Sequence, residues 1–367
     1  MPTEYRDRLK RLRRQLAESD ANALVVTHLL NIYYLSGFSG SAAILLVELD
    51  RSTLFTDGRY AVQAPQQVKP AGVRVTIPSA SILKAAGEHL GSSRTARGGA
   101  RRAAYDPAHL TVAQHQELRR SAGSRISWIT GAGWVEKLRA LKSPAEIIKM
   151  RAAARLISTV FEQVVPFIRP GATELDLAAE VDYRMRKLGA SGPSFETIVA
   201  SGPRAALPHA NPTTKRLRRN ELVVLDAGAI LADYCSDMTR TVFIGRAPNR
   251  VKSWYRAVLE AQAAAAAALA VGVESSAPDA AARRVLDTAG LGKYFVHSTG
   301  HGLGLEVHEA PRLAKDQKAK LQAGMVVTIE PGIYVEGVGG IRIEDDVAIY
   351  AGRTEVLTTA TRELLEL

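Results

Sequence analysis

Two aspartates in neighbouring apolar segments are the first residues of this sequence that could do chemistry. Asp226 lies in the apolar run 222–227, and Asp237 follows eleven positions later, directly before the run 238–243. A reversal containing Gly228 separates the runs, and adjacent antiparallel strands lie about 5 Å apart, so both carboxylates can converge on one face. Buried carboxylates are costly unless they are paired or bind metal. The pattern therefore indicates a metal site, with a turn residue as the alternative for Asp226 alone.

A histidine cluster follows in a glycine-rich stretch. His297, His301 and His308 fall within twelve positions, and Gly300 and Gly302 flank the central histidine. Glycine beside a histidine lets the backbone approach a ligand closely. Each histidine alone would more often be an ordinary core or surface side chain, but the cluster favours a metal or catalytic site. It is not of the zincin type, because the His-Glu-x-x-His helix motif is missing from it.

Two further carboxylates occur on segments that read as strands. Glu330 ends the apolar run 325–329, where Pro331 and Gly332 follow. In the stretch 340–347 the residues alternate, so Arg342 and Glu344 share one face. An ordinary salt bridge between these two side chains is the alternative reading.

Five side chains emerge as candidate metal ligands. Four carboxylates and one imidazole suit Mn²⁺, Co²⁺ or Fe²⁺ better than they suit a thiolate-type zinc site. Two divalent ions would balance the four negative charges, and a water shared between them would lose a proton near neutral pH to give a hydroxide nucleophile. The candidates are Asp226, Asp237, His301, Glu330 and Glu344.

The elements that must position these residues fall into two parts. Residues 1–135 alternate helical and strand patterns: Leu9, Leu12 and Leu16 have helical spacing, and apolar strands follow near 23–27, 42–49 and 52–56. This predicts an α/β unit with a mostly buried sheet. We place a linker at 136–143 and a second domain at 144–367.

The second domain begins with a strong helix start and carries a weak internal repeat. Ser143 is followed by Pro144 and, three positions after the serine, by Glu146, which is the pattern of a capping box. Helix pairs and strand hairpins of 144–244 recur about a hundred residues later. The sequence therefore predicts an α/β (α+β) protein whose second domain has two similar halves facing one cleft, where a binding site is expected.

Composition limits the classes of protein that the chain can be. It has 367 residues, 46% apolar and 23% charged, as in globular domains. The single cysteine, Cys235, cannot form an internal disulfide, and the charged first twenty residues lack a signal-peptide core, so we expect a cytoplasmic protein. The uncharged stretch 21–47 is better explained by two buried strands around a loop than by a membrane segment.

The net charge of +11 raises the question of nucleic-acid binding. The basic residues are scattered, with local groups at 94–102 and 215–219, and aromatic residues do not interleave with them. Residues 92–102, rich in Gly, Arg and Ser, read as a loop. Nucleic-acid binding is therefore not expected.

Five motifs in the right order resemble the pita-bread metallopeptidases, the family of aminopeptidase P, prolidase and methionine aminopeptidase. The stretch 31–38 is also similar to the creatinase-type N-terminal domain of the proline-specific branch. The resemblance covers the whole chain, and no ligand position departs from the pattern. The matching motifs are 225–228, 234–241, 300–304, 330–334 and 340–345.

The resemblance implies how the five candidate ligands divide between two ions. Asp226 would bind one ion and His301 with Glu330 the other. Asp237 and Glu344 would bridge both. The ions would be Mn²⁺ first, with Co²⁺ or Zn²⁺ as alternatives.

The resemblance also implies roles beyond metal binding. Glu330 would accept a proton from the bridging water, and His308 would donate a hydrogen bond to the tetrahedral intermediate. Arg342 would hold Glu344 or Asp237 in place. The family's second active-site histidine matches His209, which would close over the scissile bond, and His297 would contact the substrate beyond it.

The implied function is hydrolysis of the bond between an N-terminal residue and proline through a metal-bridging hydroxide. The partners would be a peptide with proline in second position and a second copy of the chain in a homodimer. Two alternatives stay open: a creatinase-type hydrolase of a non-peptide substrate, and a binding module with an altered site. The choice between dipeptidase and aminopeptidase also stays open, with the compact length favouring a prolidase-like enzyme.

Overall fold

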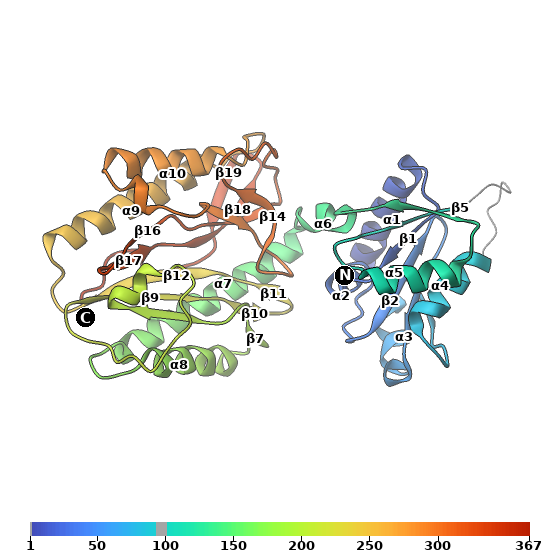
Figure 1. Cartoon of the computed structure of the whole chain (residues 1–367), viewed down its shortest axis with the longest axis horizontal. Helices are drawn as coiled ribbons and strands as arrows, with labels where there is room; N and C mark the ends of the chain where they lie inside the picture. The colour runs from blue at the N-terminus through green and yellow to red at the C-terminus, as the bar shows by residue number, and fades with distance from the viewer. Residues whose placement is uncertain (1, 93–100) are drawn as a thin grey trace. The chain divides into compact units, whose positions relative to one another are not determined.

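The computed structural model describes residues 2–92 and 101–367 and divides the chain into two compact units, Met1–Arg139 and Ala140–Leu367 (Figure 1). Within the predicted linker 136–143, residues 136–139 are helical and end the first unit. In the described part of the chain, no helix combines the length and the apolar character needed to cross a membrane.

The N-terminal unit is built on a six-stranded mixed sheet in the order β4-β3-β2-β1-β5-β6. β1 pairs antiparallel with β2 and parallel with β5, and β6 continues the parallel part. The strands are β1 (Ala23–Val26), β2 (Ala43–Glu48), β3 (Ser52–Thr56), β4 (Arg74–Thr76), β5 (Arg101–Tyr105) and β6 (Ile126–Thr130). The helices are α1 (Pro2–Glu18), α2 (Leu29–Ser36), α3 (Gln63–Val68), α4 (Ile82–Ser92), α5 (Val112–Ala122) and α6 (Trp134–Arg139).

Local sequence explains most of this unit. The predicted leucine stripe of α1 is buried, with Leu9, Leu12 and Leu16 at most 1% exposed. The segment between β1 and β2 was expected to be a loop, but it contains the helix α2. Gly37 ends this helix in the left-handed region with φ +82°, where a residue without Cβ is favoured.

The predicted loop 92–102 is only partly testable. Residues 93–100 lie outside the described residues, whereas 101–102 begin β5 and do not belong to a loop. Arg101 can enter the sheet because its buried guanidinium pairs with Glu48 of β2. A buried arginine is tolerated when a carboxylate neutralises it.

The C-terminal unit consists of two helix pairs on opposite sides of a set of strands (Figure 1). α7 (Pro144–Val164) and α8 (Glu174–Lys187) belong to the first half, and α9 (Asn249–Ala267) and α10 (Ala277–Thr288) to the second. The first half has the strands β7 (Gly192–Pro193), β8 (Ile198–Ser201), β9 (Glu221–Ala227), β10 (Ala229–Leu231), β11 (Tyr234–Cys235) and β12 (Met238–Ile244). The second has β13 (Gly300–Gly302), β14 (Glu309–Leu313), β15 (Val326–Ile329), β16 (Gly332–Val335), β17 (Gly339–Arg342), β18 (Asp345–Tyr350) and β19 (Arg353–Val356).

Each half encloses its own apolar core. α7 and α8 pack on β9 and β12, and α9 packs with α10 against β15, β17 and β18. The predicted capping box is present at the start of α7: Ser143 Oγ accepts from the Glu146 amide at 3.2 Å, and Glu146 Oε2 accepts from the Ser143 amide at 2.8 Å. These cores hold the strands that carry the candidate ligands.

Two strands expected to be continuous are interrupted. The stretch 325–334 divides into β15 and β16 at Glu330 and Pro331, and 340–350 divides into β17 and β18 at Ile343 and Glu344. Proline cannot donate to a strand ladder, so the first break is local in origin. Both breaks fall at candidate ligands, so the backbone leaves the strand ladder at Glu330 and at Glu344.

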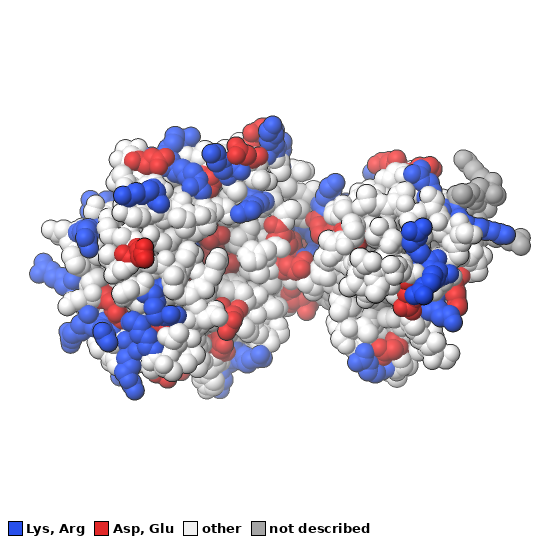
Figure 2. All heavy atoms as spheres, viewed as in Figure 1, with Lys and Arg blue, Asp and Glu red and all other residues white. Residues whose placement is uncertain are grey.

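Charged side chains are distributed over both units. Figure 2 shows Lys and Arg on the visible face of each unit with Asp and Glu side chains between them.

Candidate active site

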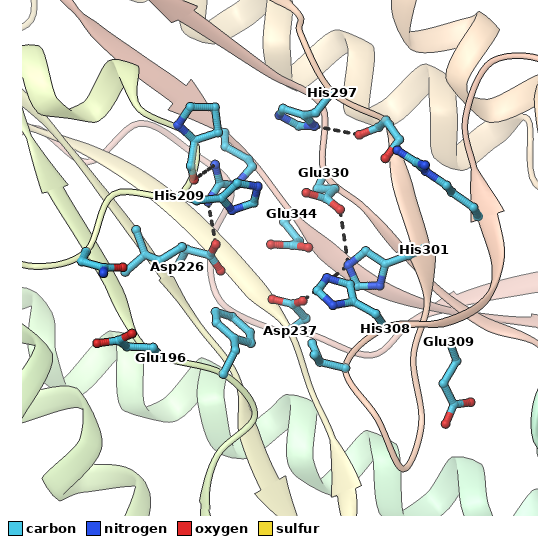
Figure 3. A pocket seen from close by; sticks show the side chains of 18 residues that line it. Glu196, His209, Asp226, Asp237, His297, His301, His308, Glu309, Glu330 and Glu344 are labelled. Carbon is cyan, nitrogen blue, oxygen red and sulfur yellow. Dashed lines mark hydrogen bonds and ion pairs between the residues drawn. The ribbon is translucent and has the colours of Figure 1, made fainter. Parts of the chain in front are cut away.

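All nine side chains singled out from the sequence line one pocket of about 580 Å³ in the C-terminal unit (Figure 3). β9 carries Asp226, and Asp237 directly precedes β12. β13 carries His301, Glu330 follows β15, and Glu344 lies between β17 and β18. The other four residues are His209, His297, His308 and Arg342.

The hairpin β9–β12 brings the two aspartates together as the sequence predicted. Asp226 is registered opposite Thr239, two residues after Asp237. The reversal between them is larger than expected, because it contains the short hairpin β10–β11. Gly228 is needed there: a Cβ at this position would lie 2.0 Å from the carbonyl oxygen of Ser236.

The candidate ligands converge on a common space. One ligand atom each of Asp237, His301 and Glu344 lies within 4.8 Å of the other two. His301 Nε2 is 3.4 Å from Glu330 Oε1 and 3.7 Å from Asp237 Oδ2. In Figure 3 these side chains point toward one another. The grouping has the donor types of a site for a hard divalent cation.

Without a cation, burial makes it unfavourable for these carboxylates to be ionised together. Asp237 and Glu344 are 5% and 2% exposed, and burial together with mutual repulsion raises their pKa values well above the usual range. Burial also raises the pKa of Glu330 to about 7, although Arg342 opposes the shift. Like charges this close disfavour simultaneous ionisation unless a cation compensates them.

Unsatisfied oxygens supply an independent test of whether a cation fits. Asp226 Oδ1 and Asp237 Oδ1 are buried, and neither has a hydrogen-bond partner in the described part of the chain. Buried polar atoms without partners are rare and call for an explanation such as a bound ion. Burial lowers the pKa of His301 to about 4, so its imidazole is neutral at pH 7, as metal binding requires. The residues therefore fit a divalent cation.

Arg342 fixes the wall of the pocket, but not by the contact expected. Its Nη2 donates to Asp226 Oδ2 at 2.5 Å, whereas the sequence predicted a contact with Glu344 or Asp237. β17 ends at Arg342, so the regular alternation stops there and the side chain reaches across to β9. Glu344 instead accepts a hydrogen bond from Thr239 Oγ1 at 2.6 Å, and Arg342 Nε donates to the same hydroxyl at 3.0 Å.

His297 is held in one orientation by hydrogen bonds to both ring nitrogens. Its Nδ1 lies 2.7 Å from the Ser298 carbonyl oxygen and therefore donates, which leaves Nε2 to accept from the Tyr334 hydroxyl at 2.8 Å. Tyr334 in turn accepts from Arg342 Nη1 at 2.6 Å. Burial lowers the pKa of His297 to about 4, so the ring is neutral at pH 7.

The remaining two histidines lie at the accessible side of the pocket. His308 packs edge-on against His301, with ring centroids 4.4 Å apart, and both His308 and His209 are exposed. Burial and the charge of His209 lower the pKa of His308. Both rings can therefore meet a substrate without occupying the ligand cluster.

The structure adds residues that the sequence did not single out. Lys142 Nζ contacts Glu309 Oε2 at 2.9 Å, and their side chains are only 1% and 5% exposed. Glu309 follows His308 directly, so the ion pair anchors the end of the loop that carries this histidine. Adjacency to His308 was the only sequence signal for Glu309. Further pocket-lining residues are Phe195, Glu196, Asn211 and Arg312.

Two protein-family models match the chain. Residues 148–351 match metallopeptidase family M24, and residues 8–141 match the creatinase/prolidase N-terminal domain. The Xaa-Pro dipeptidase of Pyrococcus furiosus is 34% identical over 98% of this chain and 100% of its own length.

Solved structures of two kinds of proline peptidase superpose on the chain. The Xaa-Pro dipeptidase from Bacillus anthracis has a TM-score of 0.93 and 35% identity, covering 99% of this chain and 100% of its own. The X-Pro aminopeptidase from Thermotoga maritima has a TM-score of 0.87 and 34% identity, covering 96% of this chain and 100% of its own. These proteins share both the fold and the two-domain organisation.

Proposed function

The chain belongs to metallopeptidase family M24, and from this we propose that it is a metal-dependent hydrolase of the bond between an N-terminal residue and proline. One observation carries the proposal. Three buried carboxylates, the partly buried carboxylate of Glu330 and a neutral imidazole line one pocket, and two of the carboxylates keep an oxygen without a hydrogen-bond partner among the described residues.

We assign two divalent ions to this pocket, with Mn²⁺ expected first because oxygen donors predominate. When bound, such ions polarise a carbonyl group and lower the pKa of water, which supplies the nucleophile of the hydrolysis. Arg342 orients the Asp226 carboxylate, and Thr239 orients the Glu344 carboxylate, so both are fixed before any ion binds. The proposed ligands are Asp226, Asp237, His301, Glu330 and Glu344.

The protein's own groups handle the proton and the developing charge. Glu330, which lines the pocket 3.4 Å from His301 Nε2, is assigned the role of accepting the proton of the attacking water and releasing it again. His308 reaches the pocket from its exposed side and donates a hydrogen bond to the oxyanion. His209 closes over the scissile bond from the rim of the pocket, and neutral His297 contacts the substrate beyond it.

The choice of proline follows from the chemistry of the bond. The amide nitrogen before the proline ring carries no hydrogen, so a peptidase that binds that N–H loses a contact. A pocket rich in carboxylates attracts the N-terminal ammonium group instead, and divalent ions held there would polarise the carbonyl group. Recognition then needs no N–H at the bond that is cut.

We further propose a dipeptidase. Arg312 lines the pocket with an exposed guanidinium, and no carboxylate of the described residues lies within 4.0 Å of it. A dipeptide carries its terminal carboxylate on the proline itself, where Arg312 can pair with it. The proposal also includes a homodimer and a cytoplasmic location, and light scattering after size-exclusion chromatography tests the dimer.

A hydrolysis panel tests both levels of the proposal. Xaa-Pro dipeptides and Xaa-Pro-Yaa tripeptides are compared in metal-free protein and after addition of Mn²⁺, Co²⁺ or Zn²⁺. We expect metal-dependent cleavage with dipeptides preferred. A preference for tripeptides would indicate an aminopeptidase. If neither dipeptides nor tripeptides are cleaved, the result would favour a creatinase-type hydrolase or a binding module.

A further inference from the structure

A second group of metal-ligating side chains lies outside the catalytic pocket, in the N-terminal unit. One ligand atom each of His28, His109 and Glu136 lies within 4.8 Å of the other two, the same limit that Asp237, His301 and Glu344 satisfy. Within residues 2–92 and 101–367 these are the two groups that meet it. The catalytic proposal makes no use of the N-terminal group.

Sheet topology explains why the three residues meet. β1, β5 and β6 are neighbouring parallel strands, and each is followed by one member of the group. His28 follows β1 and directly precedes α2, His109 lies in the turn between β5 and α5, and Glu136 lies in the first turn of α6. The carboxyl ends of parallel strands share one sheet edge, which is where open α/β sheets bind ligands.

The side chains are arranged closely around a small space. The rings of His28 and His109 stack with centroids 4.0 Å apart and planes 2° from parallel. His109 Nε2 lies 3.2 Å from Glu136 Oε1. All three residues line a cavity of about 10 Å³, which is room for a single atom or water.

Neighbouring groups hold these side chains but leave one oxygen unused. Asn31 donates to Glu136 Oε1 at 2.5 Å and accepts from Arg139 at 2.8 Å, which fixes the carboxylate. Glu136 Oε2 is buried and has no hydrogen-bond partner among the described residues. A single His–Glu ion pair would not explain this unused oxygen. A cation coordinated by all three side chains explains it.

We propose that His28, His109 and Glu136 bind one zinc-class divalent cation in the N-terminal unit. Two imidazoles and one carboxylate are the ligand set of three-residue Zn²⁺ sites that keep a fourth position for water. Ligands about 2.1 Å from one ion lie closer together than 4.8 Å, so binding draws the side chains inward by rotation. The side chains of His109 and Glu136 are 28% and 27% exposed, which gives the ion a path of entry.

The bound ion would connect α6 to the ends of β1 and β5 within this unit. Binding to the folded state alone stabilises that state, so the melting temperature should rise with Zn²⁺ concentration. This role does not depend on the proposed peptidase activity, and the two can fail separately.

The test uses the full chain with two of the five proposed catalytic ligands replaced, by Asp237→Asn and Glu344→Gln, to abolish metal binding in the catalytic pocket. The protein is dialysed against micromolar free Zn²⁺, and the retained metal is counted by mass spectrometry. We expect one ion per chain, lost on adding His28→Gln or His109→Gln. His115→Gln is the matched control, because His115 also stacks on an aromatic ring of this unit, Tyr105, but lies outside the group.

Retention of no ion in this background would overturn the proposal, as would an ion that survives either His28→Gln or His109→Gln. Circular dichroism verifies that each variant is folded. If the Asp237→Asn/Glu344→Gln variant does not fold, native mass spectrometry is used instead to compare Zn²⁺-loaded wild type with the single variant His109→Gln. One ion fewer in the variant then supports the site, and equal ion counts contradict it.

Discussion

Replacing Lys142 by methionine should destabilise the C-terminal unit strongly. The substitution preserves most of the apolar stem but removes the ammonium group that lies 2.9 Å from Glu309 Oε2. Glu309 would keep the hydrogen bond from the Glu306 amide at 3.2 Å, yet its charge would stay buried without the cation. Breaking a buried ion pair by removing one partner costs about 3–5 kcal/mol.

This magnitude translates into a measurable shift. For a unit of this size, about 1 kcal/mol lowers the melting temperature by roughly 2–4 °C, so Lys142→Met should lower it by roughly 6–20 °C. Calorimetry of the full chain follows the transition of the C-terminal unit. The double variant Lys142→Met/Glu309→Leu should recover much of the loss, because an apolar pair carries no uncompensated charge.

A matched control separates the effect of breaking a buried ion pair from the effect of removing any charged side chain. Arg151 pairs with Glu355 at 2.7 Å, but these side chains are 25% and 27% exposed. Arg151→Met should therefore cost no more than about 1 kcal/mol. Equal losses for Lys142→Met and Arg151→Met, or no recovery in the double variant, would refute the reasoning that the Lys142–Glu309 pair anchors the His308 loop.

Three other perturbations test separate parts of the account. His308→Ala should lower kcat by a factor of about 10²–10³, because the lost hydrogen bond forms in the transition state. Metal content and KM should stay near wild type. Loss of metal would instead show that His308 is a ligand. Arg312→Met should raise KM for Xaa-Pro dipeptides far more than for tripeptides. An equal rise for both substrates would contradict the proposed pairing of Arg312 with the substrate carboxylate. Burial favours a raised pKa for Glu48, but hydrogen bonds from His89, Arg51 and Arg101 outweigh it and lower the value to about 2. Its contribution to stability is therefore present above the unfolded pKa of about 4.3 and lost as pH falls toward 2. Glu48→Gln should lower the melting temperature more at pH 7 than at pH 3. An equal decrease at both pH values would contradict a stabilising contribution from the ionised Glu48 carboxylate.

Local patterns predicted the five candidate ligands, whereas His209 was singled out only by the resemblance to the family. Asp226 and Asp237 lie at the hairpin β9–β12, which their apolar neighbours and the reversal containing Gly228 indicated. The capped start of α7 was equally readable from Ser143, because a capping box needs only residues three positions apart. Such features are determined by neighbours in the chain.

Contacts between distant segments were not predictable in the same way. Arg342 reaches Asp226, 116 positions away, because β17 ends where it does, and alternation within one strand cannot reveal this. Lys142 and Glu309 are 167 positions apart, and only the folded chain brings them together. Likewise, His28, His109 and Glu136 come from three segments that meet only because β1, β5 and β6 are adjacent.

The proposed activity requires that the five ligands hold the ions needed to cut Xaa-Pro bonds. The most direct measurement is kcat/KM for an Xaa-Pro dipeptide, determined with chelator-treated protein before and after Mn²⁺ is restored, for wild type and for Asp237→Asn. We expect metal-free wild type to be inactive and to recover with Mn²⁺, and we expect the variant neither to retain metal nor to recover. Full activity in metal-free wild type, or a variant that keeps both ions and normal turnover, would contradict it.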